Sequence, residues 1–207
     1  IGGDIHKKRP FASMSIADAV PRTRPFLKIQ DGCDAFCTYC IVPHARGRSR
    51  SMPFDEVLAN IGKLAEAGYR EVVQTGIHLG VYGHDLFPKT NLATAMERIA
   101  AVLPFDRVRL RSIEPFEITE KIIYQVVKSG LFCRHFHIPL QSGDDDILKK
   151  MRRPYTRNYV HDLILKITDC MPDAAIGVDI MVGFPGETSD AFDNTYYLIQ
   201  ALPVAYL

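Results

Sequence analysis

The sequence predicts an α/β fold of parallel strands and helices, and three observations support this prediction. Short apolar runs alternate with segments of helical periodicity from Phe26 to the end of the chain. The 207 residues, 47% hydrophobic and 24% charged, are enough for one ordinary domain with its own core. No apolar run approaches the roughly 18–20 residues that span a bilayer, so no membrane association is expected.

Five strands and six helices are expected in alternation. The strands are predicted at Phe26–Gln30, Glu71–Thr75, Arg107–Ile113, Phe136–Leu140 and Ala175–Val182, and residues 204–207 look like a sixth. The helices are predicted near residues 54–67, 92–103, 118–129, 145–151, 157–170 and 188–201. Residues 1–25 have weak periodicity and three prolines, so they are expected to form an N-terminal arm or linker.

Start and stop signals support several of these helices. Pro53 stands where the first helix should begin, and Gly68 is a suitable stop. Three aspartates at 144–146 suit the positive end of the helix near 145–151, and Thr188 can cap the last helix.

The length limits how the strands can be arranged. Strand–helix alternation argues for parallel strands with right-handed crossovers, and a closed eight-unit barrel takes about 250 residues. The chain length is therefore compatible with two architectures, a partial barrel of about six units or an open doubly wound sheet. Both architectures gather ligands at the carboxyl ends of the strands, so residues directly after each strand are candidates for a site.

Three of the five cysteines, Cys33, Cys37 and Cys40, follow the first strand with the spacing C-x3-C-x2-C. Thiolates are the ligands of iron–sulfur clusters and of zinc, but a closed zinc site takes four ligands. The spacing favours a cluster with one open iron, and leaves a zinc site or incidental thiols as alternatives. Cys133 and Cys170 lack the spacing, and Cys170 is expected in the core.

The formal net charge of +1 hides an asymmetry along the chain. Residues 1–50 carry 9 basic and 4 acidic side chains, whereas residues 51–207 carry 16 and 20. The basic segment is compatible with an anionic partner such as RNA, and a solvated arm would explain the same charge.

The cysteine loop, with Tyr39 before its last cysteine, resembles that of the radical S-adenosylmethionine superfamily. Within it, Lys28–Cys33 and Cys40–Arg50 are similar to the methylthiotransferases, which modify a tRNA adenosine beside the anticodon or a ribosomal protein. Further similar segments follow in order at residues 76–78, 112–115, 137–143, 151–153 and 183–188. This resemblance covers about residues 26–207 and implies a radical domain folded as a partial (β/α)6 barrel of parallel strands with outer helices.

The resemblance also implies cofactors and the residues that bind them. Cys33, Cys37 and Cys40 would hold a [4Fe–4S] cluster whose open iron chelates S-adenosyl-L-methionine, and one electron would then release a 5′-deoxyadenosyl radical. The implied cofactor contacts are Tyr39, Thr75, Gly76, Ser112, Glu114, Gln141 and Arg153. For Glu114, an ion pair with Arg111 or Arg153 is the structural alternative. The implied RNA-facing residues are Arg46, Arg48 and Arg50.

The segment Gly76-Ile77-His78 looks like the group of methylthiotransferases that acts on N6-threonylcarbamoyladenosine in tRNA. A methylthiotransferase for isopentenyladenosine tRNA or for a ribosomal protein is the alternative, and a non-catalytic zinc-stabilised RNA-binding module is a second one.

The resemblance implies a cytoplasmic, monomeric enzyme that binds the tRNA anticodon region and takes electrons from a flavodoxin or ferredoxin. Full-length members carry an N-terminal domain with a second [4Fe–4S] cluster and a C-terminal RNA-binding domain. This chain, which begins without Met, is therefore expected to be an isolated radical domain that is incomplete for full activity.

Overall fold

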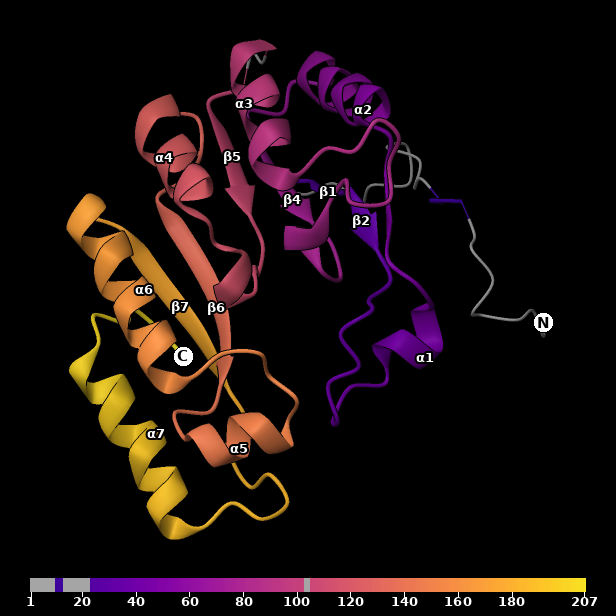
Figure 1. Ribbon diagram of the computed structural model, residues 1–207. Helices are drawn as coiled ribbons and strands as arrows, with labels where there is room; N and C mark the ends of the chain where they lie inside the picture. Colours follow the sequence, from indigo (N-terminus) through magenta and orange to yellow (C-terminus); the bar gives the residue numbers. More distant parts are fainter. Residues whose placement is uncertain (1–9, 13–22, 103–104) are drawn as a thin grey trace. The chain divides into compact units, whose positions relative to one another are not determined.

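The computed structural model describes residues 10–12, 23–102 and 105–207 (Figure 1). Most of the arm predicted over residues 1–25 lies outside the described residues, as does residue 103 at the end of a predicted helix. The chain divides into two compact units. The first unit holds the described residues of 1–35, 41–111 and 120–133, and the second holds 36–40, 112–119 and 134–207.

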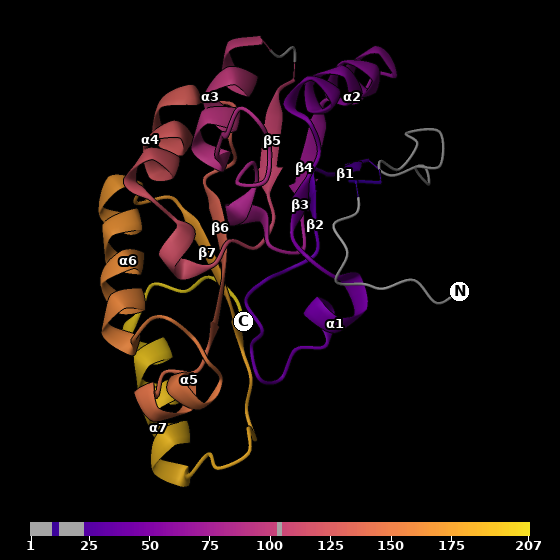
Figure 2. The same cartoon turned by 45° about the vertical axis from the view of Figure 1, so that its right-hand side comes forward.

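The first unit is built on a parallel three-stranded sheet with the order β1-β4-β5. Its strands are β1 (Phe26–Lys28), β4 (Glu71–Thr75) and β5 (Arg107–Leu110). Its helices are α1 (Val42–Arg46), α2 (Phe54–Glu66), η2 (Leu79–Val81), α3 (Leu92–Val102) and α4 (Glu120–Ser129). Helices α3 and α4 pack against each other and lie side by side in Figures 1 and 2.

Alternation along β5 separates the buried Val108 and Leu110 from Arg107 and Arg109. The buried residues that form the core of this unit include Leu27, Val72, Val108 and Leu110 from the strands and Ile61, Met96, Ile99 and Val126 from the helices. On the other face, Glu71 pairs with the arginines at 24, 107 and 109, at 3.8, 3.6 and 3.6 Å. The period-two arginines of β5 are therefore matched by an acid on the neighbouring strand.

A short antiparallel pair closes the base of the cysteine loop. The strand predicted over Phe26–Gln30 ends at Lys28, and β2 (Gln30–Asp31) pairs instead with β3 (Arg50–Ser51). Two-residue strands carry no periodic pattern, so β2 and β3 could not be separated from β1 or found by periodicity.

The second unit is built on the parallel pair of β6 (His135–Gln141) and β7 (Ala175–Ile180). Its helices are η3 (Pro115–Glu117), α5 (Asp145–Lys150), α6 (Arg157–Cys170) and α7 (Ser189–Ala201). Helices α6 and α7 lie on the same side of the β6–β7 pair in both views (Figures 1 and 2). The predicted sixth strand is present as a short pairing, in which Ala205 N donates to Ile176 O at 2.8 Å and Val178 N donates to Tyr206 O at 3.2 Å.

The helix start predicted at the aspartates 144–146 and the cap predicted at Thr188 are confirmed. The Asp144 carboxylate accepts from the backbone of Asp146 and Ile147 at 3.1 and 3.0 Å. Thr188 Oγ1 accepts from Ala191 N at 3.2 Å. The prediction that Cys170 lies in the core is wrong, because this last residue of α6 is exposed.

The strand predicted over Arg107–Ile113 ends at Leu110, where the chain leaves the first unit and soon enters η3. Across the parts of the chain that the structure describes, no helix is both long and apolar enough to cross a membrane.

Candidate functional site

Gln30 organises the cysteine loop from the first unit. Its side chain is fully buried, and its amide nitrogen donates to the carbonyl oxygens of Asp31 and Gly32 at 3.1 and 2.9 Å and to Ser49 Oγ at 3.0 Å. Its amide oxygen accepts from His78 N at 2.7 Å. One side chain thus joins both ends of the loop to the segment after β4, a role that no spacing in the sequence signals.

Asp31 holds the same loop by charge. Its carboxylate lies 2.7 Å from Arg50 Nη2 and 3.3 Å from Lys28 Nζ, and Oδ1 accepts from Gly32 N at 2.9 Å. Burial alone would raise the pKa of Asp31, but the charges of Lys28 and Arg50 and the backbone hydrogen bond lower it. The carboxylate is therefore ionised and the loop base is fixed around neutral pH.

Gly32 has to be glycine. Its φ is +73°, and a Cβ there would lie 2.1 Å from Arg48 O. This close approach brings the next residue, Cys33, against the far side of the loop, where Cys33 N donates to Gly47 O at 3.1 Å.

The segment after β4 reaches Cys33 through His78. Cys33 Sγ lies 3.4 Å from His78 Nδ1, and His78 is 9% exposed. Thr75 O accepts from Ile29 N at 2.9 Å, which places the predicted contact Thr75 beside β1. A Cβ on Gly76 would lie 2.9 Å from both Cβ and Oε1 of Gln30, so the close approach that Gly76 permits is that of a protein side chain.

In the second unit, Arg153 joins the cysteine segment to two strand ends. Nη1 donates to Cys37 Sγ at 3.2 Å and to Tyr39 Oη at 3.4 Å, Nε donates to Tyr155 Oη at 2.8 Å, and Nη2 contacts Glu114 and, at 3.3 Å, the carbonyl oxygen of Pro139. A guanidinium has five N–H donors, so these five contacts occupy all of them. A ligand carboxylate at Arg153 would have to replace one of these partners.

The charges around Arg153 stabilise this arrangement. Burial has the largest single effect and lowers the pKa of Arg153, but Glu114, Tyr155 and Tyr39 together outweigh it, so the pKa lies above its usual value. Burial raises the pKa values of Tyr39 and Tyr155, so both phenols keep their protons. Glu114 thus forms the ion pair with Arg153 that was the structural alternative to a cofactor contact.

The cysteine segment is also fixed to the end of α5. Thr38 N donates to Met151 O at 3.3 Å, and Thr38 Oγ1 donates to Lys150 O at 3.0 Å. Tyr39 packs against the buried cluster of Ile147, Met151 and Ala191. Its ring is therefore part of the packing in this unit, whatever it contacts in a ligand.

The end of β6 is strained at the predicted contact Gln141. Its φ is +69°, which L-residues other than glycine seldom adopt. The next residues are anchored to α7, because Gly143 N donates to Thr195 Oγ1 at 2.8 Å and Ser142 Oγ lies 3.3 Å from the same atom. Backbone strain of this kind is concentrated at functional sites, so it is consistent with the prediction that Gln141 contacts a cofactor.

Among the predicted RNA-facing residues, Arg46 and Arg48 are exposed, but Arg50 is largely committed to the loop. Besides Asp31, Arg50 donates to the carbonyl oxygens of Arg46 and Arg48 at 3.0 and 3.2 Å. Arg48 forms an exposed ion pair with Asp34 at 3.2 Å.

All five cysteines are free thiols. Cys33 belongs to the first unit and Cys37 and Cys40 belong to the second. Within residues 10–12, 23–102 and 105–207, no three His, Cys, Asp or Glu side chains are grouped as a metal site. The donor set nevertheless fits a soft metal centre, since three partly exposed thiols share one loop and a guanidinium faces Cys37 Sγ. Outside the loop, burial raises the pKa of the Cys133 thiol.

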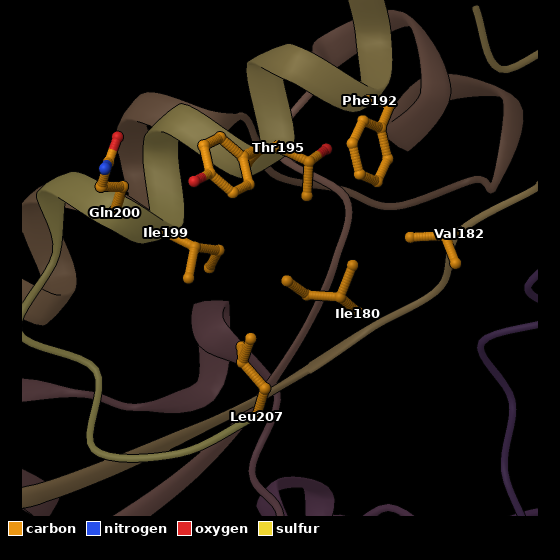
Figure 3. A pocket seen from close by; sticks show the side chains of 8 residues that line it. Ile180, Val182, Phe192, Thr195, Ile199, Gln200 and Leu207 are labelled. Carbon is orange, nitrogen blue, oxygen red and sulfur yellow. The ribbon is translucent and has the colours of Figure 1, made fainter. Parts of the chain in front are cut away.

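An apolar groove of about 320 Å³ lies elsewhere in the second unit (Figure 3). Side chains from α7, the end of β7 and the last residue line it, namely Ile180, Val182, Phe192, Thr195, Tyr196, Ile199, Gln200 and Leu207. No predicted site residue lines the groove, so it is separate from the candidate site.

Curated relatives of the chain are tRNA-modifying enzymes. It is 41% identical to the threonylcarbamoyladenosine tRNA methylthiotransferase MtaB of Bacillus subtilis over 95% of the chain and 44% of that protein. It is 40% identical to the tRNA-2-methylthio-N(6)-dimethylallyladenosine synthase of Clostridium tetani over 88% of the chain and 40% of that protein. The chain therefore spans less than half the length of these relatives.

Solved structures share the fold at low sequence identity. The radical S-adenosylmethionine methyltransferase TsrM from Kitasatospora setae matches 87% of this chain and 34% of its own, with a TM-score of 0.71 and 15% identity. The cobalamin-dependent S-adenosylmethionine radical enzyme OxsB matches 84% and 26%, with a TM-score of 0.63. These matches confirm the predicted partial-barrel α/β fold class. The sequence profile described as "Radical SAM superfamily" matches residues 27–199, and the chain belongs to that superfamily.

Proposed function

We propose that residues 26–207 are the radical domain of a tRNA methylthiotransferase. The observation that carries the proposal is the C-x3-C-x2-C loop in a chain 41% identical, over 95% of its length, to a tRNA methylthiotransferase. Cys33, Cys37 and Cys40 would hold a [4Fe–4S] cluster. With S-adenosylmethionine, such a cluster supplies a 5′-deoxyadenosyl radical, and the protein supplies binding, orientation and exclusion of water.

The contacts of the described residues suggest how the chain does this. Gln30 and Asp31 fix the base of the loop, and Arg153 donates to Cys37 Sγ at 3.2 Å. A cation next to a ligand sulfur balances the negative charge of a thiolate-bound centre. Thr75, Gly76, Ser112, Glu114 and Gln141 are the proposed surroundings of S-adenosylmethionine, together with Tyr39 and Arg153.

We propose N6-threonylcarbamoyladenosine beside the anticodon as the target. The segment Gly76-Ile77-His78 supports this choice, but relatives that act on dimethylallyladenosine are about as similar, at 40% identity. The proposal also includes a flavodoxin or ferredoxin as electron donor, a monomer in the cytoplasm, and a second cluster outside these 207 residues.

Anaerobic reconstitution with iron and sulfide tests the proposal. We expect about four iron and four sulfide per chain, a cluster absorbance band that changes on addition of S-adenosylmethionine, and reductant-dependent formation of 5′-deoxyadenosine. The Cys37→Ser variant should lose all three signals. The exposed thiol Cys170, which lies outside the loop, provides the matched control, and Cys170→Ser should behave as the wild type.

Two results would contradict the proposal. One equivalent of zinc without iron or sulfide would favour the zinc-stabilised RNA-binding module. Cofactor cleavage at the full rate by Cys37→Ser would show that the loop is not the cluster site.

A further inference from the structure

Ser112, His137 and Asp179 form a chain of polar contacts within the second unit. Ser112 Oγ lies 2.7 Å from His137 Nδ1, and Asp179 Oδ1 lies 3.3 Å from His137 Nε2. Ser112 follows β5, His137 lies in β6 and Asp179 lies in β7. The fold therefore places one imidazole between a hydroxyl and a carboxylate that are 67 positions apart in the sequence.

The Asp179 carboxylate bears on the hydrogen position of the imidazole. Its negative charge lies 3.3 Å from His137 Nε2 and favours the tautomer that carries its hydrogen on that nitrogen. In the neutral ring Nδ1 is then an acceptor, and the hydroxyl of Ser112 is the donor. Because a serine hydroxyl has a single hydrogen, Ser112 Oγ has only lone pairs left for another group.

Aromatic stacking holds the imidazole in this orientation. The His137 ring stacks on the Tyr206 ring at 5.9 Å between centroids, with 21° between planes. Tyr206 also stacks on His135 at 6.0 Å, and its Oη lies 2.7 Å from His135 Nε2. A Cβ on Gly177 would lie 2.1 Å from Tyr206 Cζ, so the tyrosine lies directly over that glycine.

We propose that His137 is a positioning residue that makes Ser112 a hydrogen-bond acceptor for S-adenosylmethionine. The ligand group would be an N–H or O–H donor, either the α-ammonium group or a ribose hydroxyl. This inference rests on the proposed function, in which Ser112 contacts that cofactor. Without His137, the Ser112 hydroxyl rotates freely and no longer presents its lone pairs in one direction, so the donor group of the ligand is held less tightly.

The test replaces His137 by phenylalanine, which keeps an aromatic ring on Tyr206. For the reconstituted protein under anaerobic conditions, we expect His137→Phe and Ser112→Ala each to raise the Kd for S-adenosylmethionine about tenfold. The double variant should bind no more weakly than either single one, because His137 acts through Ser112. His161→Phe, in α6 and outside this group of contacts, is the control and should stay within about twofold of the wild type. Binding of methionine and of 5′-methylthioadenosine separates the two donor groups, since only methionine carries the ammonium and only the nucleoside carries the ribose.

A second measurement does not require the cluster. ¹⁵N chemical shifts of the histidine side chains should show a protonated Nε2 and an unprotonated Nδ1 for His137, and the opposite tautomer would overturn the inference. Wild-type binding by His137→Phe, or effects of His137→Phe and Ser112→Ala that multiply, would also overturn it. If the wild type itself binds neither cluster nor S-adenosylmethionine, the proposed function fails and this inference fails with it. If the wild type binds and His137→Phe binds equally well, the inference alone fails.

Discussion

At Arg153, five polar contacts converge on a guanidinium whose residue is 8% exposed. The partners include Cys37 in the cysteine segment, Glu114 after β5 and Pro139 in β6, so Arg153 links the cysteine segment to β6. Burying these ions costs free energy of desolvation. Removing one of them costs more, because the other ion stays partly buried without its partner.

Replacing Arg153 by alanine should therefore destabilise the protein strongly. Arg153→Ala leaves the partly buried Glu114 without its cation, and we expect a loss of about 3 kcal/mol in the free energy of unfolding, measured with urea. Arg152→Ala, at the exposed neighbouring position, should change it by less than about 0.5 kcal/mol. Equal stability of the two variants would mean that the Arg153 contacts contribute nothing.

Glu114→Gln combined with Arg153→Met provides the second comparison. This pair removes both charges and keeps the volume, so it should recover part of the stability that Arg153→Ala loses. A double variant as unstable as Arg153→Ala would assign the loss to packing and not to the unpaired carboxylate.

Among the elements, the pairing of residues 205 and 206 with β7 depends on Gly177. A Cβ there would lie 2.1, 2.4 and 2.5 Å from Cζ, Oη and Cε2 of Tyr206. Gly177→Ala should therefore displace the ring, weaken the pairing and lower the free energy of unfolding by about 1–3 kcal/mol, with a change in the near-UV circular dichroism of tyrosine.

Gly62 in α2 is the matched control, because a Cβ there meets nothing within 4 Å. Gly62→Ala should stabilise the protein by about 0.5–1 kcal/mol, as expected for alanine in a helix. Destabilisation by both substitutions, or by neither, would contradict this account of Gly177. Tyr206→Ala should remove most of the effect of Gly177→Ala, since it deletes the ring that the new Cβ meets.

Helices and strands with a clear period could be predicted from the sequence, but contacts between distant residues could not. The strand Glu71–Thr75 and the helix 157–170 agree with β4 and α6 residue by residue. In contrast, Gln30 and His137 are ordinary polar residues in strands, and only the fold brings them to His78, Ser112 and Asp179. Short elements such as α1 and β3 lacked enough residues to show a period.

At the scale of the whole molecule, several basic side chains in the described part of residues 1–50 are paired with acidic ones. Less of this positive charge is therefore available to an anionic partner. Lys28 and Arg50 face Asp31, and Arg24 faces Glu71. Arg46 is exposed, and the exposed ion pair of Arg48 with Asp34 is of a kind that contributes little to stability. Among the described residues of this segment, Arg46 and Arg48 are therefore the best candidates for contacts with RNA phosphates.

The dependence of RNA binding on salt tests this assignment. With an anticodon stem-loop RNA and fluorescence anisotropy, log Kd against log salt concentration should be less steep for the double variant Arg46→Gln/Arg48→Gln than for the wild type. The slope should fall by about 0.7–0.9 for each lost phosphate contact, because each contact releases condensed counterions. Lys121→Gln, at an exposed position of α4 in the acidic part of the chain, should leave the slope unchanged. An equal slope for the double variant and the wild type would remove both arginines from the RNA interface, and an equal fall for Lys121→Gln would mean that only the net charge matters.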